Sequence, residues 1–288
     1  MDYLVTMTTH VPAGTLEQAV DDIRAREAAH SRELADHAAQ QAPKRPGQPF
    51  VTGTEQRVAI VTGGSQGIGA GLVAGYRQRG WAVVACARTI KPSPDPDVLS
   101  VDGDIAVPGT ADRIIGAALQ RFGRIDTLVN NAGVYLSKPF TDYTADDYAL
   151  VTGVNLTGFF WLTQRAIAEM LKRGGGHVVN ISATLADYAN SAVPEVLAAL
   201  TKGGLAAATR SLAIEYAARG IRVNAVSPGV IQTPAHPPES YADLPGGLPP
   251  LGHVGQISDV VDSILFLESS PYITGEILHV DGGQIAGH

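Results

Sequence analysis

A glycine-rich segment over residues 62–69 has the residue types of a phosphate-binding turn. It reads Thr-Gly-Gly-Ser-Gln-Gly-Ile-Gly. Gly63 suits a tight turn, Gly67 lets a pyrophosphate approach the backbone, and Gly69 lets a helix pack closely on a strand. Free N–H groups at the start of a helix would add the positive end of its dipole. The segment predicts dinucleotide binding, although a plain strand-to-helix connection can contain the same glycines.

The residues on either side supply the elements that would position this turn. Residues 57–61 form a short apolar run, which is typical of a buried parallel strand. A helical pattern follows from residue 67 to about residue 78. We therefore expect a strand, the glycine turn and a helix in succession.

Further short motifs follow in a set order along the chain. They are Asn-Asn-Ala-Gly at 130–133, Asn155, Ser182, Lys202, Ser-Pro-Gly-Val-Ile-Gln-Thr at 227–233, and a closing segment at 274–283. In this order they resemble the short-chain dehydrogenase/reductase family, over residues 57–288. The resemblance implies one α/β domain with a doubly wound, Rossmann-like parallel sheet. It also implies an oxidoreductase that uses a nicotinamide dinucleotide.

The resemblance indicates which residues would bind that cofactor. In the first half of the domain they are Gly63, Ser65, Gln66, Gly67, Ile68, Gly69, Asp104, Ile105, Asn130, Ala132 and Gly133. In the second half they are Lys202, Pro228, Gly229, Ile231 and Thr233. The glycine turn would hold the pyrophosphate, Asp104 would contact the adenine, and Lys202 would bind the hydroxyls of the nicotinamide ribose.

The end of the expected second strand favours NADP(H) over NAD(H). A site for NAD(H) needs a carboxylate there to accept a hydrogen bond from the ribose 2′-hydroxyl. The strand expected at 81–87 ends in Ala87 and is followed by Arg88. Ala87 would not repel a 2′-phosphate, and the planar guanidinium of Arg88 could pair with it. The alternative for Arg88 is a solvated surface arginine.

Three polar residues match the positions that act on the substrate in the resembling family. Ser182 follows the strand expected at 177–181 and would hydrogen-bond the substrate oxygen. Asn155 lies in a helical stretch and would hold a water of the proton relay. Lys202, expected to open a long helix, would lower the pKa of a neighbouring tyrosine that exchanges the proton.

That tyrosine is absent from this sequence. Ala198 stands one helical turn before Lys202, and a methyl group has no proton to give. The interval from Ser182 to Lys202 is longer than is usual in the family, so the connection between them is altered as well. It contains Tyr188, which could supply a displaced hydroxyl, and Glu195, a carboxylate that a helix start favours.

Three explanations for Ala198 stay open. The tyrosine was replaced deliberately, or the chain performs related chemistry with another acid or a bound water, or it binds cofactor without turnover in a structural or regulatory role. The altered connection argues against a simple point substitution, and the presence of Ser182, Asn155 and Lys202 favours chemistry. We therefore expect an NADP(H)-dependent oxidoreductase that acts on a carbonyl or alcohol small molecule with an atypical proton donor.

The composition limits the remaining classes of function. The 288 residues suit one large domain with an appendage. A formal net charge of −7 argues against a nucleic-acid partner. A single cysteine, Cys86, fits a reducing compartment, and neither a membrane span nor a signal pattern is visible. We expect a cytoplasmic protein without a membrane partner or a metal site.

Residues 1–40 do not follow the dehydrogenase pattern. Strand formers at 3–11 precede a helical pattern at 16–40, and a proline-rich linker follows at 41–56. The unit resembles the first half of the muconolactone isomerase fold; because the second half is absent, we expect no isomerase activity. One strand and one helix bury too little surface to be stable alone, so a docking or oligomerisation role is expected.

Two further expectations concern assembly and substrate. The helices at Asn155 and after Lys202 are rich in small and apolar residues, which in the resembling family pack against other subunits, so we expect a homotetramer or homodimer. Residues 233–253 are rich in proline and glycine and fit a lid over a substrate. The expected pocket borders are mostly apolar, which favours a small to medium hydrophobic carbonyl compound.

Overall fold

The structure is a computed structural model, and it describes residues 56–234, 247 and 249–287. The expected appendage at 1–40 lies outside the described residues. So do the linker at 41–56, apart from its last residue, and the middle of the expected lid at 233–253.

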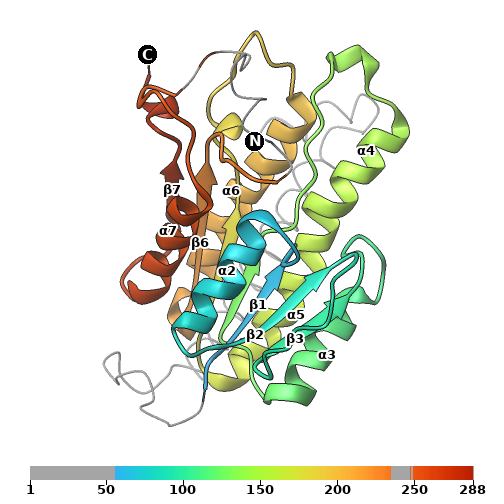
Figure 1. Cartoon of the computed structure of the whole chain (residues 1–288), viewed down its shortest axis with the longest axis vertical. Helices are drawn as coiled ribbons and strands as arrows, with labels where there is room; N and C mark the ends of the chain where they lie inside the picture. The colour runs from blue at the N-terminus through green and yellow to red at the C-terminus, as the bar shows by residue number, and fades with distance from the viewer. Residues whose placement is uncertain (1–55, 235–246, 248, 288) are drawn as a thin grey trace, which may run out of the picture. The chain divides into compact units, whose positions relative to one another are not determined.

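In the described part of the chain, seven parallel strands form the central sheet, in the order β3-β2-β1-β4-β5-β6-β7 (Figure 1). They are β1 (Val58–Thr62), β2 (Ala82–Ala87), β3 (Val98–Asp102), β4 (Thr127–Asn130), β5 (Gly176–Ile181), β6 (Ile221–Pro228) and β7 (Ile277–Val280). Strands β1 and β4 are buried along their whole length, and for β1 the apolar run at 57–61 predicts this burial. This sheet confirms the doubly wound, Rossmann-like α/β fold.

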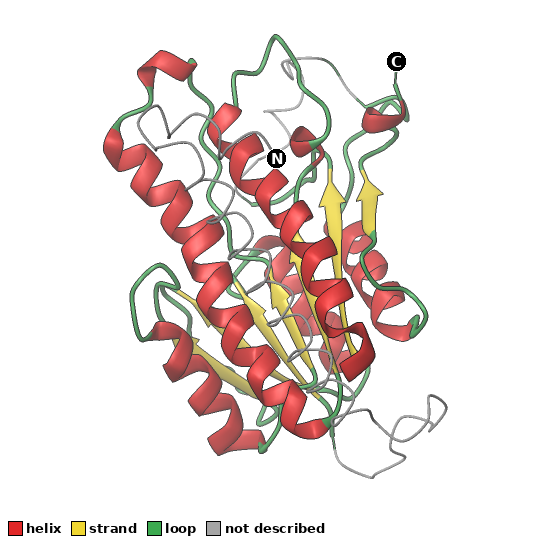
Figure 2. Cartoon of the chain, turned by 180° about the vertical axis from the view of Figure 1, so that it is seen from behind, coloured by secondary structure: helices red, strands yellow, loops and turns green. Residues whose placement is uncertain are grey.

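Helices cover both faces of the sheet. Helices α2 (Gly67–Gln78) and α7 (Ile257–Ser269) contact each other on one face and share a core with Val61 and Val83 (Figure 1). The other face carries α3 (Thr110–Phe122), α5 (Phe159–Arg173) and α6 (Val196–Tyr216), which lie in front of the sheet in Figure 2.

Helix α4 (Ala145–Thr152) continues into α5 through η3 (Gly153–Gly158), a π-helical segment that contains Asn155. Helical dihedral angles at both junctions make this one long helix, which Figure 2 shows. A π-helical turn inside an α-helix is frequently found at a functional site. The helix expected near Asn155 is therefore confirmed, and its π-helical segment contains Asn155 itself.

Two expected element boundaries were wrong. Helix α6 begins at Val196, so Lys202 lies in its second turn and does not open it. The closing strand β7 covers only the middle of the expected segment at 274–283, because glycines with positive φ at Gly275 and Gly282 bracket it.

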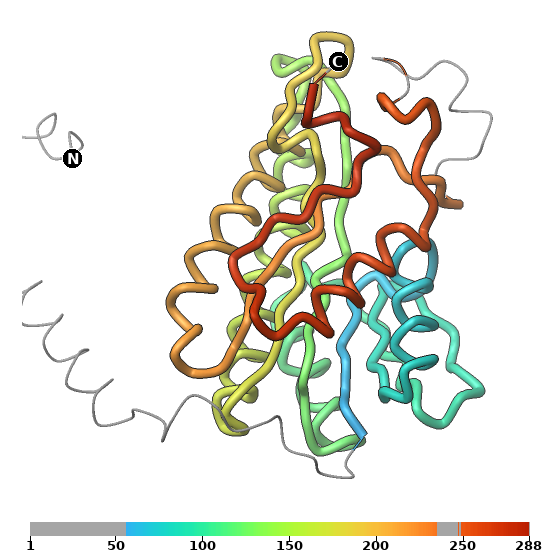
Figure 3. The backbone as a smooth tube through the Cα atoms, turned by 90° about the vertical axis from the view of Figure 1, so that its left-hand side faces the viewer, coloured from blue at the N-terminus to red at the C-terminus, as the bar shows by residue number. Residues whose placement is uncertain are grey.

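The end of the chain runs beside the connection between β5 and α6. In Figure 3 the dark red end of the chain, which includes β7, runs along β6 to the end of the sheet where this connection lies. The Thr184 hydroxyl lies 3.5 Å from the Asp281 carboxylate, and His279 Nε2 lies 3.2 Å from the carboxylate of Asp187. The C-terminal segment therefore supports the connection that contains the altered interval between Ser182 and Lys202.

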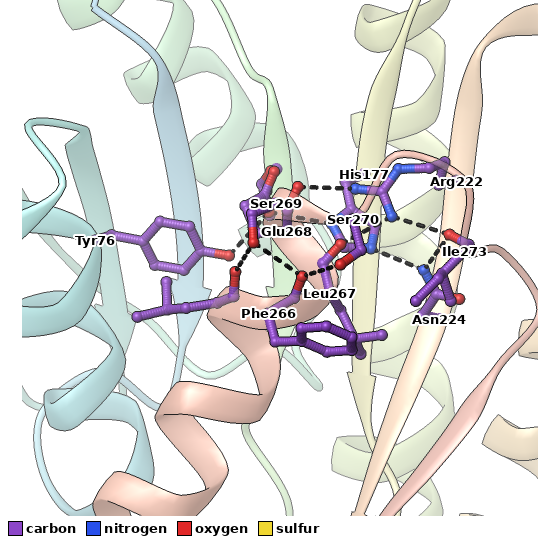
Figure 4. A network of polar contacts seen from close by, with 12 residues as sticks. Tyr76, His177, Arg222, Asn224, Phe266, Leu267, Glu268, Ser269, Ser270 and Ile273 are labelled. Atoms are coloured by element: carbon purple, nitrogen blue, oxygen red, sulfur yellow. Dashed lines mark hydrogen bonds and ion pairs between the residues drawn. The ribbon is translucent and has the colours of Figure 1, made fainter.

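A buried carboxylate anchors the end of α7 at the amino ends of β4 and β5 (Figure 4). Glu268 Oε2 accepts hydrogen bonds from Tyr76 Oη at 3.1 Å, from Thr127 Oγ1 at 2.9 Å and from His177 Nδ1 at 3.1 Å. Arg222 donates to the backbone carbonyls of Leu267 at 3.0 Å and Glu268 at 3.2 Å, the last turn of the helix. One side chain thus joins α2, β4, β5 and α7.

Candidate active site

A cleft of about 480 Å³ opens at the carboxyl ends of β1 to β4. The strand order reverses between β1 and β4, and ligands of doubly wound sheets bind where the order reverses. The volume is within the range of small-molecule sites. Predicted cofactor residues that line it are Gly63, Ser65, Gln66, Gly67, Ile68, Gly69, Arg88, Asp104, Ile105, Ala132, Gly133 and Thr233.

The glycine turn has the backbone geometry that the sequence predicts. Gly63 and Gly67 have φ angles of +66° and +56°, a region that residues with a side chain rarely adopt. A Cβ on Gly69 would lie 2.1 Å from the carbonyl oxygen of Gly63. Helix α2 starts directly after this turn without a side-chain cap from Gln66 and without an acidic residue in its first turn. Its N–H groups therefore face the cleft with a positive dipole end that suits an anion.

The end of β2 forms one wall of the cleft and carries no carboxylate. Cys86, Ala87, Arg88 and Thr89 line the cleft there. Burial raises the pKa of the Cys86 thiol to about 11, which leaves it neutral. Arg88 is exposed at the rim. The wall is therefore free of negative side-chain charge at the position where an NAD(H) site needs one.

Asn130 and Asn131 have different tasks. Asn130 is buried and donates to Thr163 Oγ1 at 2.8 Å and to Asn180 Oδ1 at 2.9 Å, so it ties β4 to β5 and α5 away from the cleft wall. Asn131 lines the cleft and donates to the carbonyl of Thr62 at 2.7 Å. The sequence analysis did not select Asn131, although it stands inside the same motif.

Other predicted cofactor residues lie outside the cleft lining, and other residues join it. Those outside are Asn130, Lys202, Pro228, Gly229 and Ile231. Those that the sequence analysis did not select are Cys86, Ala87, Thr89, Gly103, Asn131, Val134, Val154 and Pro234. Most of these unselected lining residues stand next to a predicted residue in the sequence. Their position beside a recognised motif is therefore the signal by which they could have been found.

Ser182, Lys202 and Asn155 come together at the end of β5. Lys202 Nζ donates to the carbonyl oxygen of Ile181 at 2.7 Å, and Ser182 Oγ donates to the backbone carbonyl of Lys202 at 3.2 Å. A Cβ on Gly133 would lie 3.1 Å from Lys202 Nζ and 3.5 Å from Asn155 Oδ1. Since Gly133 lines the cleft, Lys202 and Asn155 meet the cleft at this glycine, and Ser182 is linked to it through Lys202.

Asn155 positions a loop. Its Oδ1 accepts from the N–H of Val134 at 2.8 Å. Its Nδ2 donates to the carbonyl of Val134 at 3.0 Å and to Thr201 Oγ1 at 3.1 Å. Both amide N–H donors are therefore used within the protein, and they hold the loop after β4 against α6.

The start of α6 differs from what a tyrosine at position 198 would require. Ala198 is only 2% exposed, so little free space surrounds its methyl group. The backbone carbonyls of Leu197 and Ala198 both accept from Thr201 Oγ1 at 3.1 Å. Tyr188 lies earlier in the connection, where its N–H donates to the carbonyl of Thr184 at 2.9 Å. Tyr188 and Ala198 thus belong to different parts of the β5–α6 segment.

A tyrosine and a carboxylate that the sequence analysis did not pair lie at the same helix start. Tyr135, directly after Val134, donates from Oη to Glu195 Oε2 at 3.0 Å. Glu195 is the residue before α6. Within the described residues, no group of three His, Cys, Asp or Glu side chains could hold a metal ion, and no helix is long and apolar enough to cross a membrane.

Known proteins match most of this chain. The model of a family described as enoyl-(acyl carrier protein) reductase matches residues 63–284. A 3-oxoacyl-(acyl-carrier-protein) reductase of Thermotoga maritima is 34% identical over 248 residues, which cover 80% of this chain and 98% of the relative. A 3beta-hydroxysteroid dehydrogenase of Eggerthella lenta is 34% identical over 254 residues, which cover 79% of this chain and 93% of the relative.

Solved structures agree with these matches. A 3-ketoacyl-(acyl-carrier-protein) reductase from Brucella melitensis, complexed with NADH, superposes with a TM-score of 0.73 at 28% identity, covering 80% of this chain and 99% of that one. ElxO with NADP bound superposes with a TM-score of 0.75 at 27% identity, covering 81% of this chain and 100% of that one.

Proposed function

The chain belongs to the short-chain dehydrogenase/reductase family of oxidoreductases, and from this premise we propose that it interconverts an alcohol and a carbonyl group of a small molecule with NADP(H). One observation carries the proposal: the glycine turn and Gly133 line one cleft, and Lys202, which is hydrogen-bonded to Ser182, lies next to Gly133. The bound cofactor would supply or accept the hydride.

The preference for NADP(H) rests on the end of β2. Ala87 offers no carboxylate to a ribose 2′-hydroxyl, and Arg88 lies at the cleft rim where a 2′-phosphate would sit. A guanidinium can hold a phosphate through two parallel hydrogen bonds. Asp104, whose carboxylate accepts from the N–H of Ala106 at 2.9 Å, would meet the adenine. A solved structure with NADP bound and another with NADH are both similar to this chain, so the proposed preference rests on the local residues.

The proposed chemistry uses the residues around Gly133. Lys202 would donate to the ribose hydroxyls of the nicotinamide half, and Ser182 would hydrogen-bond the substrate oxygen. The pKa of Lys202 is lowered to about 8 by burial, so the side chain is mostly charged at neutral pH. Ala198 provides no proton, so the donor must lie elsewhere. From the sequence, Tyr188 and a water held near Ser182, Asn155 and Lys202 are the candidates.

We also propose that the chain forms a homotetramer or homodimer. Large apolar side chains are exposed on the outer sides of α5 and α6: Phe160 is 54% exposed and Ile214 is 79% exposed. We take these exposed apolar side chains on the outer faces of two helices as support for a subunit interface. Ala206, in contrast, is buried within the subunit and is not available for such contacts.

Two measurements test the proposal. The dissociation constants of NADPH and NADH are measured by fluorescence titration, and we expect tighter binding of NADPH. Turnover is then followed at 340 nm with NADP⁺ and two probe alcohols, ethyl 3-hydroxybutanoate and cyclohexanol, and with the matching ketones and NADPH. Tight NADPH binding without turnover of any probe would favour the alternative, a catalytically silent cofactor-binding protein, because Ala198 already lacks the proton donor.

A further inference from the structure

Tyr135 and Glu195 form a hydrogen-bonded pair that the roles proposed above do not use. Tyr135 lies in the loop after β4, and its Oη donates to Glu195 Oε2 at 3.0 Å. Tyr135 as a whole is 46% exposed. Glu195 is partly exposed and directly precedes α6. The pair therefore bridges two chain segments that follow the carboxyl ends of neighbouring strands, β4 and β5.

Two further contacts fix the pair next to the cleft. Ser137 Oγ donates to the carbonyl of Pro194 at 2.8 Å, one residue before Glu195. Asn155 holds both backbone groups of Val134, the neighbour of Tyr135, and Val134 itself lines the cleft. The position of the Tyr135 ring is thus tied on one side to the cofactor cleft and on the other to the start of α6.

The pair lies in the direction in which a side chain at position 198 would extend. Residues three apart share one face of a helix, and each Cα–Cβ bond tilts toward the helix N-terminus. A long side chain therefore covers the turn that precedes its own Cα. For Ala198 this is the turn that starts at Glu195. Tyr135 and Glu195 bring a hydroxyl and a carboxyl group to the start of α6, the turn toward which a side chain at position 198 would extend.

We propose that Tyr135 and Glu195 form the proton relay of the alcohol–carbonyl interconversion, a proposal that rests on the oxidoreductase function proposed above. Tyr135 contacts the substrate oxygen and is the catalytic residue. Glu195 acts through Tyr135 and is a relay residue. The observed hydrogen bond already has the direction that alcohol oxidation needs, because Tyr135 donates to Glu195 and keeps its oxygen lone pairs for the substrate hydroxyl.

Three transfers balance the reaction. In alcohol oxidation the substrate C–H bond would break, and the bound oxidised nicotinamide would supply the acceptor for its hydride. The substrate O–H proton passes to Tyr135 Oη, and the proton of Tyr135 passes to the Glu195 carboxylate. The products are a carbonyl compound, reduced cofactor and a neutral carboxyl group, which loses its proton to water. In carbonyl reduction the same transfers run in reverse.

The electrostatic setting is consistent with this relay. Burial raises the pKa of Glu195, and burial together with Glu195 raises the pKa of Tyr135 to about 12. Tyr143 is the other titratable group that acts on Tyr135, and its own Oη donates to the carbonyl of Leu136 at 2.9 Å. A carboxyl group with a raised pKa holds and releases a proton closer to neutral pH, as a general acid–base group requires.

The test compares Tyr135→Phe and Glu195→Gln with the unaltered full chain in oxidation of ethyl 3-hydroxybutanoate and cyclohexanol by NADP⁺. We expect Tyr135→Phe to lower kcat by roughly 10²-fold or more. In the unaltered protein kcat for alcohol oxidation should rise with pH as Glu195 loses its proton. Glu195→Gln keeps the hydrogen-bond acceptor but cannot take a proton, so kcat should fall and should no longer rise with pH. Glu195→Asp should restore that rise in part. A solvent deuterium isotope effect on kcat should be present in the unaltered protein and smaller in Glu195→Gln.

Controls separate the relay from folding and from the proposed function. Tyr148→Phe removes the hydroxyl of an exposed tyrosine on α4 and should leave kcat within about threefold. The melting temperature and the NADP⁺ dissociation constant should stay unchanged in both relay variants. Suppose that the unaltered protein oxidises a probe alcohol. If Tyr135→Phe and Glu195→Gln then keep its kcat and pH profile, or if only Tyr188→Phe loses activity, the relay is wrong and the oxidoreductase function stands. An unaltered protein that binds NADP⁺ and oxidises neither probe refutes the oxidoreductase function itself.

Discussion

Lys202 Nζ lies 2.7 Å from the carbonyl oxygen of Ile181, the residue directly before Ser182. This contact fixes the second turn of α6 against the end of β5 and holds a buried ammonium group beside Gly133 at the cleft. An ammonium has three N–H donors, and one of them serves this carbonyl. We expect the ribose hydroxyls of the cofactor to accept from the others.

The first prediction concerns the pH dependence of cofactor binding. Burial lowers the pKa of Lys202 to about 8. Contacts with the ribose favour the charged form, so binding raises that pKa and takes up a proton as pH rises through 8. Affinity for NADPH should therefore fall above pH 8, by at most about tenfold per pH unit for one proton. Fluorescence titration from pH 7 to 9.5 measures it.

Two variants assign this effect. Lys202→Met should bind NADPH weakly and without the pH dependence. Lys172→Met removes an exposed lysine that pairs with Glu169, and it should keep the affinity and its pH dependence. A fall in affinity above pH 8 that persists in Lys202→Met would assign the titration to another group.

A second prediction tests the glycine turn. In Gly69→Ala the new Cβ would lie 2.1 Å from the carbonyl oxygen of Gly63, so the turn must open and NADPH binding should be lost. Gly116→Ala is the matched control. Gly116 lies on α3, and apart from the backbone of that helix no atom lies within 4 Å of where its Cβ would be. This variant should keep NADPH binding and gain about 0.5–1 kcal/mol in the free energy of unfolding. Unchanged NADPH affinity in Gly69→Ala would contradict the phosphate-binding role.

A third prediction addresses the choice of cofactor. Ala87→Asp places a carboxylate at the end of β2, which repels a 2′-phosphate and accepts from a 2′-hydroxyl. Ala87→Asp should weaken NADPH binding by at least about tenfold and strengthen NADH binding, while Arg88→Ala should weaken NADPH binding only. A charged hydrogen bond contributes about 1.5–3 kcal/mol, or roughly 10- to 100-fold in affinity. Arg121→Ala, which removes a contact with the carbonyl of Pro96, serves as the control.

The sequence predicted those parts of the site that backbone geometry determines. The glycine turn and the α2 bounds follow from local rules on φ angles and helix starts, so they could be recognised one residue at a time. The side-chain task of Asn130 could not, because it depends on Thr163 and Asn180, which come from two other elements. Likewise Glu195 gains a partner only when the fold brings Tyr135 beside it from 60 residues away.

A fourth prediction concerns the buried network at the end of α7. His177 Nε2 accepts from Asn224 Nδ2 at 3.1 Å, and Asn224 Oδ1 in turn accepts from the N–H of Glu276 at 3.1 Å. Protonation of His177 would therefore break a fixed hydrogen bond, and burial lowers its pKa. In the unfolded chain this histidine has its ordinary pKa of about 6.5, so below that pH the unfolded state binds more protons than the folded state. The free energy of unfolding should therefore fall as the pH drops from 6.5.

Chemical denaturation between pH 7 and pH 5 measures this loss. His177→Gln should be less stable at pH 7 and should show a flatter pH dependence, whereas His253→Asn, at an exposed position, should behave like the unaltered protein. Glu268→Ala removes the acceptor of three hydrogen bonds and should cost about 3–5 kcal/mol at pH 7. An unchanged slope of stability against pH in His177→Gln would disprove the assignment.

The last prediction returns to Ala198. Its methyl group is 2% exposed, and a larger side chain there extends toward the turn of Glu195. A tyrosine would therefore compete with the Tyr135 ring for space and would cost about 1–3 kcal/mol through overpacking. We expect Ala198→Tyr to lower turnover of the probe alcohols and the melting temperature together.

Ala198→Phe isolates the contribution of the new hydroxyl, because the two rings have almost the same volume. If Tyr135 and Glu195 move the proton, both variants displace them and should lose a similar part of kcat, on the order of 10²-fold. If the site lacks only the tyrosine hydroxyl, the kcat of Ala198→Tyr should be higher than that of the unaltered protein, and the kcat of Ala198→Phe should not. Turnover, melting temperature and NADPH affinity measured side by side separate these outcomes, since only a restored proton donor raises kcat while the affinity stays the same.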